Sequence, residues 1–502
     1  MDCRKFIYPI LLKNTPPWLN YLLTDSGVPV VQVEEPGCEY SIVIGNGLSG
    51  IDTGNEKCLF IDWKSLLPDS SMSFNEISDR LYLPAATGWI ENGITLSENC
   101  ISDQLRETII ESLRQKITGF GYPWIYFSPF PAGYDNVFNF RIDIDENEPD
   151  DWKRAIKALE PVKHATTWFL SVSATEKSPA IYDWLRGCDL HSHGYHHHIH
   201  QYDDKLNRIE IQRAAEIYKI NGFRAIGFAP PCGRITQELL SIINIMQYQF
   251  ISGLGDPNGS LPMRDHRGLW HIHSLPLSEG LYLDRNISNS EIIIQGYLSM
   301  ADRAWKNNKP VLVYGHAERR LGRKPEIISR LIHELSGMRH FWHVSLTKYT
   351  DWLKRRNEIC FNVMALQNNC EHLQLNWKHS MMDAKPQLNV MWRNNYQEIA
   401  LKEYNGYLEI VFDKTQKSIN NVDSLNKVHT FPNNEPVSLK HLVKRYLDWE
   451  RETPPGLLLK GRMRSRLKAV FRWLTDKRWR EKHRAKEWKL QFNSIDEKLK
   501  AA

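Results

Sequence analysis

Short apolar runs alternate with amphipathic helical patterns over the middle of the chain, from about residue 130 to 356. The runs that resemble strands cover residues 138–145, 166–172, 188–193, 225–229, 249–252, 269–275, 310–315 and 342–346. Between them, apolar residues recur at helical spacing over residues 151–159, 205–220, 235–245, 290–306 and 325–336. This alternation is typical of parallel strands joined by helical crossovers. Seven or eight repeats predict an α/β fold, a distorted (β/α) barrel over residues 126–356.

The pattern changes on both sides of this region. Residues 1–125 predict an N-terminal α/β domain of unknown role, with strands at 28–33, 40–44 and 58–62 and helices at 73–81 and 103–117. Residues 357–435 alternate apolar and polar positions with period two, which predicts a β-rich accessory domain with strands at 359–364, 372–377, 387–392 and 407–412. Residues 436–502 predict a basic amphipathic helical tail.

A glycine-rich segment follows one of the N-terminal strands. Residues 45–50 match GxGxxG, the spacing of a dinucleotide-binding turn. The following residues, 51–57, are rich in turn formers and too short for the helix that would hold a pyrophosphate. A plain glycine-rich turn is therefore favoured over a nucleotide site.

The net charge of +5 over 502 residues is unevenly placed. Residues 456–502 contain fifteen Lys and Arg against five Asp and Glu, a balance of +10, so the rest of the chain is slightly acidic. In this tail, apolar residues recur at helical spacing, at Met463, Leu467, Val470, Phe471 and Leu474. Such a helix could lie on an anionic membrane surface or pack its apolar stripe on the body. No RNA-binding fold accompanies it, so nucleic acid is not an expected partner.

The eight cysteines are scattered and form no CxxC pair. This excludes a zinc ribbon and a dense disulfide framework, and it favours a reducing compartment. No small-residue cleavage signature follows the N-terminal apolar stretch, and no apolar run approaches the roughly 18 residues of a membrane span. We therefore expect a cytoplasmic protein, with peripheral contact to the inner face of the membrane as an option for the tail.

Histidines cluster after the strand at residues 188–193. His193 and His197 lie four residues apart, which brings both rings to one face of a helix or of a tight turn. Imidazole suits zinc or another divalent ion, so these two are candidate metal ligands. The neighbouring histidines are expected to flank the site. The alternative is an exposed histidine-rich loop without a metal.

Asp143 and Asp145 end the apolar strand at residues 138–145, and their side chains share one face. Carboxylates that point into one cleft repel each other, so they usually hold a cation or divide their roles. One could complete an Asp-His-His ligand set, while the other takes a proton from water. The alternative is that Asp143 pairs with Arg141 and that Asp145 caps the helix beginning near Glu148.

His316 follows the apolar strand at residues 311–314. A single histidine after a strand is more often structural than catalytic. A catalytic role for His316 is favoured by its position, because Asp143, Asp145, His193 and His316 all lie at or just beyond the carboxyl ends of predicted strands. Barrel enzymes have their active sites at these strand ends.

When these aspartates and histidines are considered together, residues 138–356 resemble the NodB-like polysaccharide deacetylases, carbohydrate esterase family 4. The motifs that carry the resemblance occur in the family's order. They are residues 140–145 for the first motif, 193–197 for the second, 227–233 for the third, Leu269 and Trp270 for the fourth and 311–316 for the fifth, with residues 345–352 as the closing helix.

The resemblance implies a fold and a set of roles. The fold would be a distorted barrel of about seven strands. Asp145, His193 and His197 would hold zinc or another divalent metal, Asp143 would be the general base and His316 the general acid. The substrate and its oxyanion would contact Pro231, Cys232, Gly233 and Trp270.

Two positions depart from the family pattern. The first motif usually has adjacent aspartates, whereas Ile144 separates them here, so the roles of Asp143 and Asp145 could be exchanged. The third motif usually has an arginine where this chain has Ala229. Arg141, close to Asp143 in sequence, is the best candidate to replace it.

These observations predict a metal-dependent hydrolase of C–N bonds. The expected reaction removes an acetyl group from an N-acetylated sugar of a surface polysaccharide or its precursor, and the expected partner is a glycan or a lipid-linked or nucleotide sugar. The alternatives are an inactive glycan-binding or scaffold protein on the same barrel and an amidohydrolase of a non-sugar substrate.

Overall fold

The computed structural model of the chain describes residues 4–32, 42–46, 58–197, 199, 204–283, 285–338, 340–367, 371–378, 384–392, 395–402 and 405–412. Residues 1–197 and 210–433 group into one compact unit, and residues 198–209 and 434–502 into another. The predicted basic tail lies outside the described residues, as does most of the glycine-rich segment. All that follows concerns the first unit.

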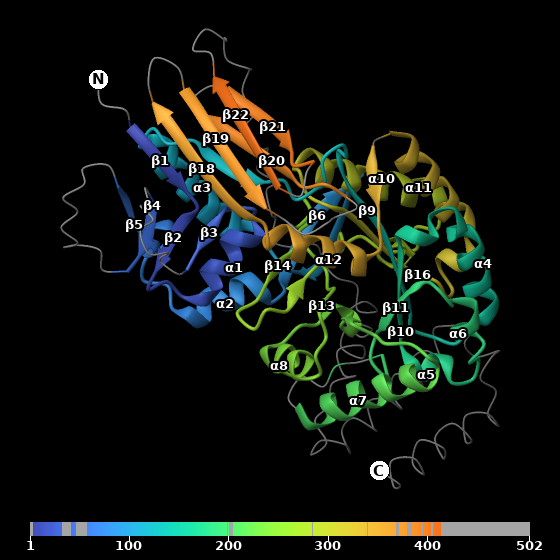
Figure 1. The fold of residues 1–502 in the computed structure, drawn as a ribbon. Coiled ribbons are helices and arrows are strands. Elements are labelled where there is room, and N and C mark those ends of the chain that lie inside the picture. The colour runs from blue at the N-terminus through green and yellow to red at the C-terminus, as the bar shows by residue number, and fades with distance from the viewer. Residues whose placement is uncertain are drawn as a thin grey trace, which may run out of the picture. The chain divides into compact units, whose positions relative to one another are not determined.

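A nine-stranded sheet dominates this unit (Figure 1). Its main path runs in the order β14-β15-β13-β12-β11-β10-β9-β16, and β17 pairs with the beginning of β9. All neighbours are parallel except β14 and β15. The strands are β9 (Asn136–Ile144), β10 (Thr166–Leu170), β11 (Asp189–Ser192), β12 (Gly227–Phe228), β13 (Phe250–Ile251), β14 (Met263–Arg264), β15 (Trp270–His271), β16 (Val311–His316) and β17 (Phe341–His343).

The sheet is a curled half-barrel rather than a closed barrel. Strand order and direction follow the prediction, because each strand of the β/α repeat lies beside the next and the late strand β16 returns to β9. Between β15 and β16 no ladder forms in the described residues. Only a backbone hydrogen bond of 2.8 Å, from Leu275 N–H to Leu312 O, joins the segment after β15 to β16. The predicted closure is therefore corrected to an open edge.

Helices follow the strands. They are α4 (Pro149–Leu159), α5 (Val172–Thr175), α6 (Ile181–Trp184), α7 (Asp204–Ile220), α8 (Gln237–Ile245), α9 (Glu279–Leu283), α10 (Ser290–Lys306), α11 (Pro325–Met338) and α12 (Leu346–Asn357). Helices α4, α7, α8, α10, α11 and α12 lie where they were predicted, whereas the short helices α5, α6 and α9 were not predicted. Helix α4 illustrates why a helix begins where it does. Pro149 occupies its first turn, where a missing N–H costs nothing, and Asp150 and Asp151 complement the positive end of the helix dipole.

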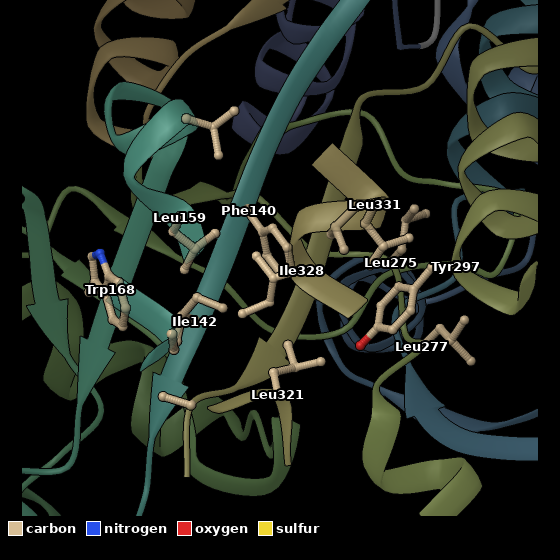
Figure 2. Packing of buried hydrophobic residues seen from close by; sticks show 14 of the residues in the cluster. Phe140, Ile142, Leu159, Trp168, Leu275, Leu277, Tyr297, Leu321, Ile328 and Leu331 are labelled. Atoms are coloured by element: carbon tan, nitrogen blue, oxygen red, sulfur yellow. The ribbon is translucent and has the colours of Figure 1, made fainter. Parts of the chain in front are cut away.

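The two faces of β9 have different neighbours. Phe140 and Ile142 point outward into a core with Leu159 of α4 and with Ile328 and Leu331 of α11 (Figure 2). The alternate residues point to the other face, where Val137 packs in a second core. Because strand side chains alternate, Asn139, Arg141 and Asp143 share that inner face with Val137. The sheet therefore buries apolar residues on both faces, and the inner face of β9 also carries polar residues toward its carboxyl end.

The N-terminal part contains a parallel sheet in the order β3-β2-β4-β5. Its strands are β2 (Ile10–Lys13), β3 (Val30–Val31), β4 (Ile42–Gly45) and β5 (Leu59–Asp62), and the helices α1 (Pro17–Asp25), α2 (Phe74–Tyr82) and α3 (Gln104–Gly119) follow them. An antiparallel hairpin, β6 (Ala85–Glu91) and β7 (Ile94–Cys100), comes between α2 and α3. The strands and helices predicted for residues 1–125 are thereby confirmed.

Two antiparallel sheets join the first residues of the chain to the last described ones. In one, β1 (Arg4–Tyr8) runs beside β18 (Cys360–Gln367), followed by β19 (Glu371–Lys378) and β22 (Asn405–Phe412) (Figure 1). In the other, β8 (Trp124–Phe127) pairs with β20 (Gln387–Trp392) and β20 with β21 (Asn395–Ala400). The predicted domain boundaries remain predictions. Among the described helices, none is long and apolar enough to cross a membrane.

Candidate active site

Polar side chains converge where β9, β11 and β16 end. Asp143 lies near the end of β9, with Asp145 just beyond it, and His193 follows β11 directly. The register of β9 and β16 sets His316 opposite Asp143. Because parallel strands bring their carboxyl ends to one edge, residues far apart in sequence meet there.

Asp145, His193 and His197 form the one group of three His, Cys, Asp or Glu in the described residues whose ligand atoms lie within 4.8 Å of one another. Asp145 Oδ1 is 3.3 Å from His193 Nε2 and 3.4 Å from His197 Nε2. Ligands bound at about 2.0–2.2 Å around a tetrahedral zinc ion are separated by about 3.3–3.5 Å. Asp145 Oδ1 is buried and accepts no hydrogen bond of ordinary geometry. The three residues therefore fit a divalent ion.

Backbone contacts orient the ring of His193. Its Nδ1 lies 2.7 Å from the carbonyl oxygen of Ala229, which only an Nδ1–H can satisfy. This fixes the proton on Nδ1 and leaves the lone pair of Nε2 directed at Asp145, as a metal ligand requires. Gly194 follows with a φ of +81°, a left-handed turn that brings His197 back toward the same point.

Charges in the ligand set shift each other's protonation. Burial alone raises the pKa of Asp145, but the nearby imidazoles, led by His197, outweigh burial and hold that pKa well below its usual range. Burial likewise lowers the pKa of His193, whereas the carboxylates of Asp143 and Asp145 raise it above the usual value. The apo site thus favours an ionised aspartate beside a partly protonated imidazole.

Arg141 clamps Asp143 from the same strand. Its Nε and Nη2 donate to the two carboxylate oxygens at 2.8 and 2.6 Å, and both side chains are 2% exposed. Its Nη1 donates to the carbonyl oxygens of Ser252 and Gly253 at 2.6 and 3.2 Å. The guanidinium therefore fixes the carboxylate and is itself fixed by the end of β13. Asp143 Oδ2 remains 3.7 Å from His193 Nε2, at the edge of the ligand set.

His316 has an acidic partner on α9. Its Nδ1 lies 2.8 Å from Oε1 of Glu279, which is 1% exposed, and its Nε2 lies 3.8 Å from Asp145 Oδ2. Arg320 also approaches, with Nη1 2.8 Å from Nδ1 and 3.4 Å from Glu279 Oε1. Nδ1 donates to Glu279 in one tautomer and accepts from Arg320 in the other.

A second buried carboxyl group adjoins Asp145. Glu318 Oε1 accepts the backbone N–H of Asp145 at 3.1 Å, while Oε2 is buried and has no hydrogen-bond partner. Burial, and then the charge of Asp145, raise the pKa of Glu318 well above its usual range. Burial therefore favours the protonated, neutral form of this carboxyl group.

The predicted substrate residues fall into two groups. Pro231, Cys232 and Gly233 form a short 3-10 turn beyond β12, next to Gly194. Pro231 has no backbone N–H, and the Gly233 N–H donates to Pro230 O at 3.0 Å.

Trp270 is 1% exposed and packs in the inner core, with the guanidinium of Arg264 over its ring. The fourth motif therefore contributes a core residue, and the prediction that Trp270 contacts substrate is corrected on this ground.

The other histidines of the cluster lie outside the ligand set where they are described. His191 contacts Asp189 and Thr347, and His196 contacts Glu210. His198 and His200 lie outside the described residues. The prediction that these residues flank the metal ligands agrees with the first two.

Three polar residues of the site were not predicted from the sequence. Glu279 comes from a separate segment, and no local pattern indicates its contact with His316. Glu318 and Tyr314 lie two residues after and before His316, so the period-two rule for strands could have suggested both.

The fold and the site together define a class of protein: a curled (β/α) half-barrel with an Asp-His-His ligand set beside a clamped carboxylate and a carboxylate-bound imidazole. Residues 140–251 match the model of the family described as polysaccharide deacetylase, which confirms the resemblance over that segment. Over residues 140–251 the chain therefore contains a polysaccharide deacetylase domain. The match covers the first three motifs and ends before His316.

Several solved structures are similar to under half of this chain. A candidate polysaccharide deacetylase from Mycobacterium smegmatis is 14% identical, with a TM-score of 0.40, over 45% of this chain and 92% of its own. A family 4 carbohydrate esterase from Streptomyces lividans is 15% identical, with a TM-score of 0.30, over 41% and 90%. A family 4 pseudoenzyme from Bacillus anthracis is 13% identical, with a TM-score of 0.34, over 43% and 66%. At these scores they add nothing to the family match. No curated protein matches the sequence significantly.

Proposed function

We propose that this chain is a metal-dependent carbohydrate deacetylase that removes the acetyl group from an N-acetylated sugar of a surface polysaccharide or its precursor. One observation carries the proposal. The ligand atoms of Asp145, His193 and His197 lie within 4.8 Å of one another, with Asp143 Oδ2 3.7 Å from His193 Nε2 and His316 Nε2 3.8 Å from Asp145 Oδ2. The family match of residues 140–251 supports the substrate class.

The base in this proposal is Asp143. Each of its carboxylate oxygens accepts one hydrogen bond from Arg141, so each keeps a lone pair with which to take a proton from the attacking water. The two hydrogen bonds also hold the carboxylate in one orientation. Arg141 thus does what the usual arginine of the third motif would do, in place of Ala229.

The acid in this proposal is His316. Its Nε2 is the source of the proton that the leaving nitrogen receives, and Glu279 at Nδ1 holds the ring and stabilises the imidazolium. The backbone of the turn at residues 231–233 is assigned to the acetyl oxygen as charge develops there. A divalent ion such as zinc, held by Asp145, His193 and His197, would supply Lewis-acid charge to the acetyl oxygen and to the attacking water.

An inactive glycan-binding or scaffold protein is the second candidate. The observation that favours it is Ala229, which stands where the family has an arginine in its third motif. The cytoplasmic location and a membrane contact through residues 436–502 remain predictions, as does the choice between lipid-linked, nucleotide and polymeric sugars.

Acetate release from N-acetylglucosamine oligosaccharides by zinc-loaded protein tests the proposal. We expect Asp143→Asn and His316→Gln each to lower kcat by about a hundredfold or more, as loss of a general base or acid does. His196→Gln, in the same loop but outside the ligand set, should stay near wild type. Glycan binding without acetate release by the metal-loaded wild type would instead establish the second candidate.

A further inference from the structure

Tyr314 lies next to both functional groups of the candidate site, here called its two arms: the Arg141–Asp143 pair and the acid His316. It precedes His316 by two residues on β16, and the parallel register sets it opposite Arg141, while His316 is opposite Asp143. Residues two apart in a strand share a face. Arg141, Asp143, Tyr314 and His316 therefore occupy four adjacent positions on the inner face of the sheet.

The side chain of Tyr314 contacts both arms. Its hydroxyl oxygen is 3.0 Å from Nε2 of His316, the nitrogen that must deliver the proton. Its ring lies under the guanidinium of Arg141, 5.0 Å from ring centroid to Cζ, and Phe169 covers the same guanidinium at 5.1 Å. The ring thus steadies the arginine that clamps the base, and the hydroxyl reaches the acid.

The protonation pattern sets the direction of the phenol contact. In the tautomer whose Nδ1–H donates to Glu279, the Nε2 of the neutral ring carries a lone pair and accepts the O–H of Tyr314. Burial, and then the carboxylate of Asp143, raise the pKa of Tyr314 well above its usual range, so the phenol stays protonated. A protonated His316 reverses this contact, since Nε2–H then donates to the phenol oxygen and the O–H turns elsewhere.

We propose that Tyr314 is a catalytic residue through which the proton of His316 reaches the leaving nitrogen; this rests on the deacetylase function proposed above. The Nε2–H proton moves to the phenol oxygen as the phenol hydrogen moves to the amide nitrogen, and the C–N bond of the tetrahedral adduct breaks. Tyrosine ends protonated as it began, imidazole ends neutral, and the amine leaves with its bonding pair.

Substrates with different leaving groups distinguish a proton-transfer role of Tyr314 from a structural role. An amide nitrogen must be protonated to leave, whereas 4-nitrophenolate leaves without a proton. Tyr314→Phe removes only the hydroxyl and keeps the ring over Arg141. The test compares its kcat on an N-acetylglucosamine oligosaccharide with its kcat on 4-nitrophenyl acetate, using zinc-loaded full-length protein.

We expect Tyr314→Phe to lower kcat on the oligosaccharide about tenfold or more, with KM and zinc content unchanged, and to leave ester turnover as in wild type. Tyr349→Phe is the matched control. It removes a buried phenol that donates to Pro129 O at 3.2 Å on α12, and both rates should stay unchanged. An equal fall on both substrates, or no fall on the oligosaccharide, overturns the inference.

Proton inventories on the wild type test the same step if the variant fails to fold. Two protons in flight predict a curved dependence of the oligosaccharide kcat on solvent deuterium fraction, and a linear one overturns the inference. A wild type that hydrolyses neither substrate overturns the proposed function and this inference together. A wild type active on both with an unaffected Tyr314→Phe overturns the inference alone.

Discussion

At the scale of single residues, two buried carboxyl groups of opposite character lie side by side in the site. The pKa of Asp145 is held well below its usual range by the imidazoles around it, in spite of burial. The pKa of Glu318 is raised well above its usual range by burial and by the charge of Asp145. One is therefore ready to bind a cation, and the other is costly to ionise.

Replacement of Glu318 with Gln should stabilise the metal-free protein, and more so at higher pH. The unfolded carboxyl group titrates near 4.3. Because its folded pKa is higher, the native state binds one extra proton between the two values, and wild-type stability falls as pH rises there. Gln does not titrate, so we expect Glu318→Gln to gain about 1 kcal/mol near neutral pH over wild type.

Urea unfolding with chelator at pH 5 and pH 8 measures this difference. Glu111→Gln is a control in which the change in the free energy of unfolding has the opposite sign. The hydrogen bond from Arg114 lowers the pKa of the exposed Glu111, so the loss of this carboxylate should destabilise the protein. A Glu318→Gln variant no more stable at pH 8 than wild type would contradict the assignment of a neutral carboxyl group.

The affinity of the site for metal should depend on pH through His193. Its pKa is raised above the usual value, against the effect of burial, by the carboxylates of Asp143 and Asp145. Metal binds the unprotonated Nε2, so below the raised pKa each binding event releases a proton. We expect the Kd for zinc to rise about tenfold for each pH unit below that raised pKa. Calorimetry in buffers of different ionisation enthalpy counts the protons, and a pH-independent Kd would refute the assignment.

At the scale of elements, the turn after β11 determines whether His197 can reach the ligand set. Gly194 has a φ of +81°, and a Cβ there would lie 3.1 Å from the backbone oxygen of His196. Gly194→Ala should strain the turn by about 1–2 kcal/mol and weaken zinc affinity about tenfold.

Gly222→Ala is the matched control for this turn. Gly222 has a φ of +80° at the end of α7, with no atom within 4 Å of an added Cβ. It should cost similar stability and leave zinc affinity unchanged. Equal zinc affinity in the two alanine variants would show that the turn does not position His197.

The sequence predicts elements well where the pattern is local. Strand β9 and helices α4 and α10 have long, regular apolar patterns, and the structure confirms them. The two-residue strand β14 was not predicted, because it is too short to show a period. The closure of the barrel was predicted wrongly, since whether β15 and β16 pair depends on distant packing.

The same limit applies to the candidate site. Strand ends predicted that Asp143, Asp145, His193 and His316 meet, because parallel strands align their carboxyl ends. Glu279 could not be predicted, since its contact with His316 depends on how α9 packs against β16. The pairing of β1 with β18, across more than 350 positions, has no local signal either.

At the scale of the whole molecule, metal binding should couple to folding. A ligand that binds only the native state stabilises it by about 2.7 kcal/mol at a hundred times its Kd. Zinc should therefore raise the Tm of the wild type, because it binds the three ligands only where folding brings them together. His197→Ala should abolish the shift and His196→Ala should keep it. A shift that survives His197→Ala would place the metal elsewhere.

Crystals of the zinc-soaked protein, measured on both sides of the zinc absorption edge, test the central claim most directly. We predict one strong anomalous peak within about 2.0–2.2 Å of an Asp145 carboxylate oxygen and of the Nε2 atoms of His193 and His197. The absence of a peak at these three atoms, in protein that still releases acetate, would contradict the account.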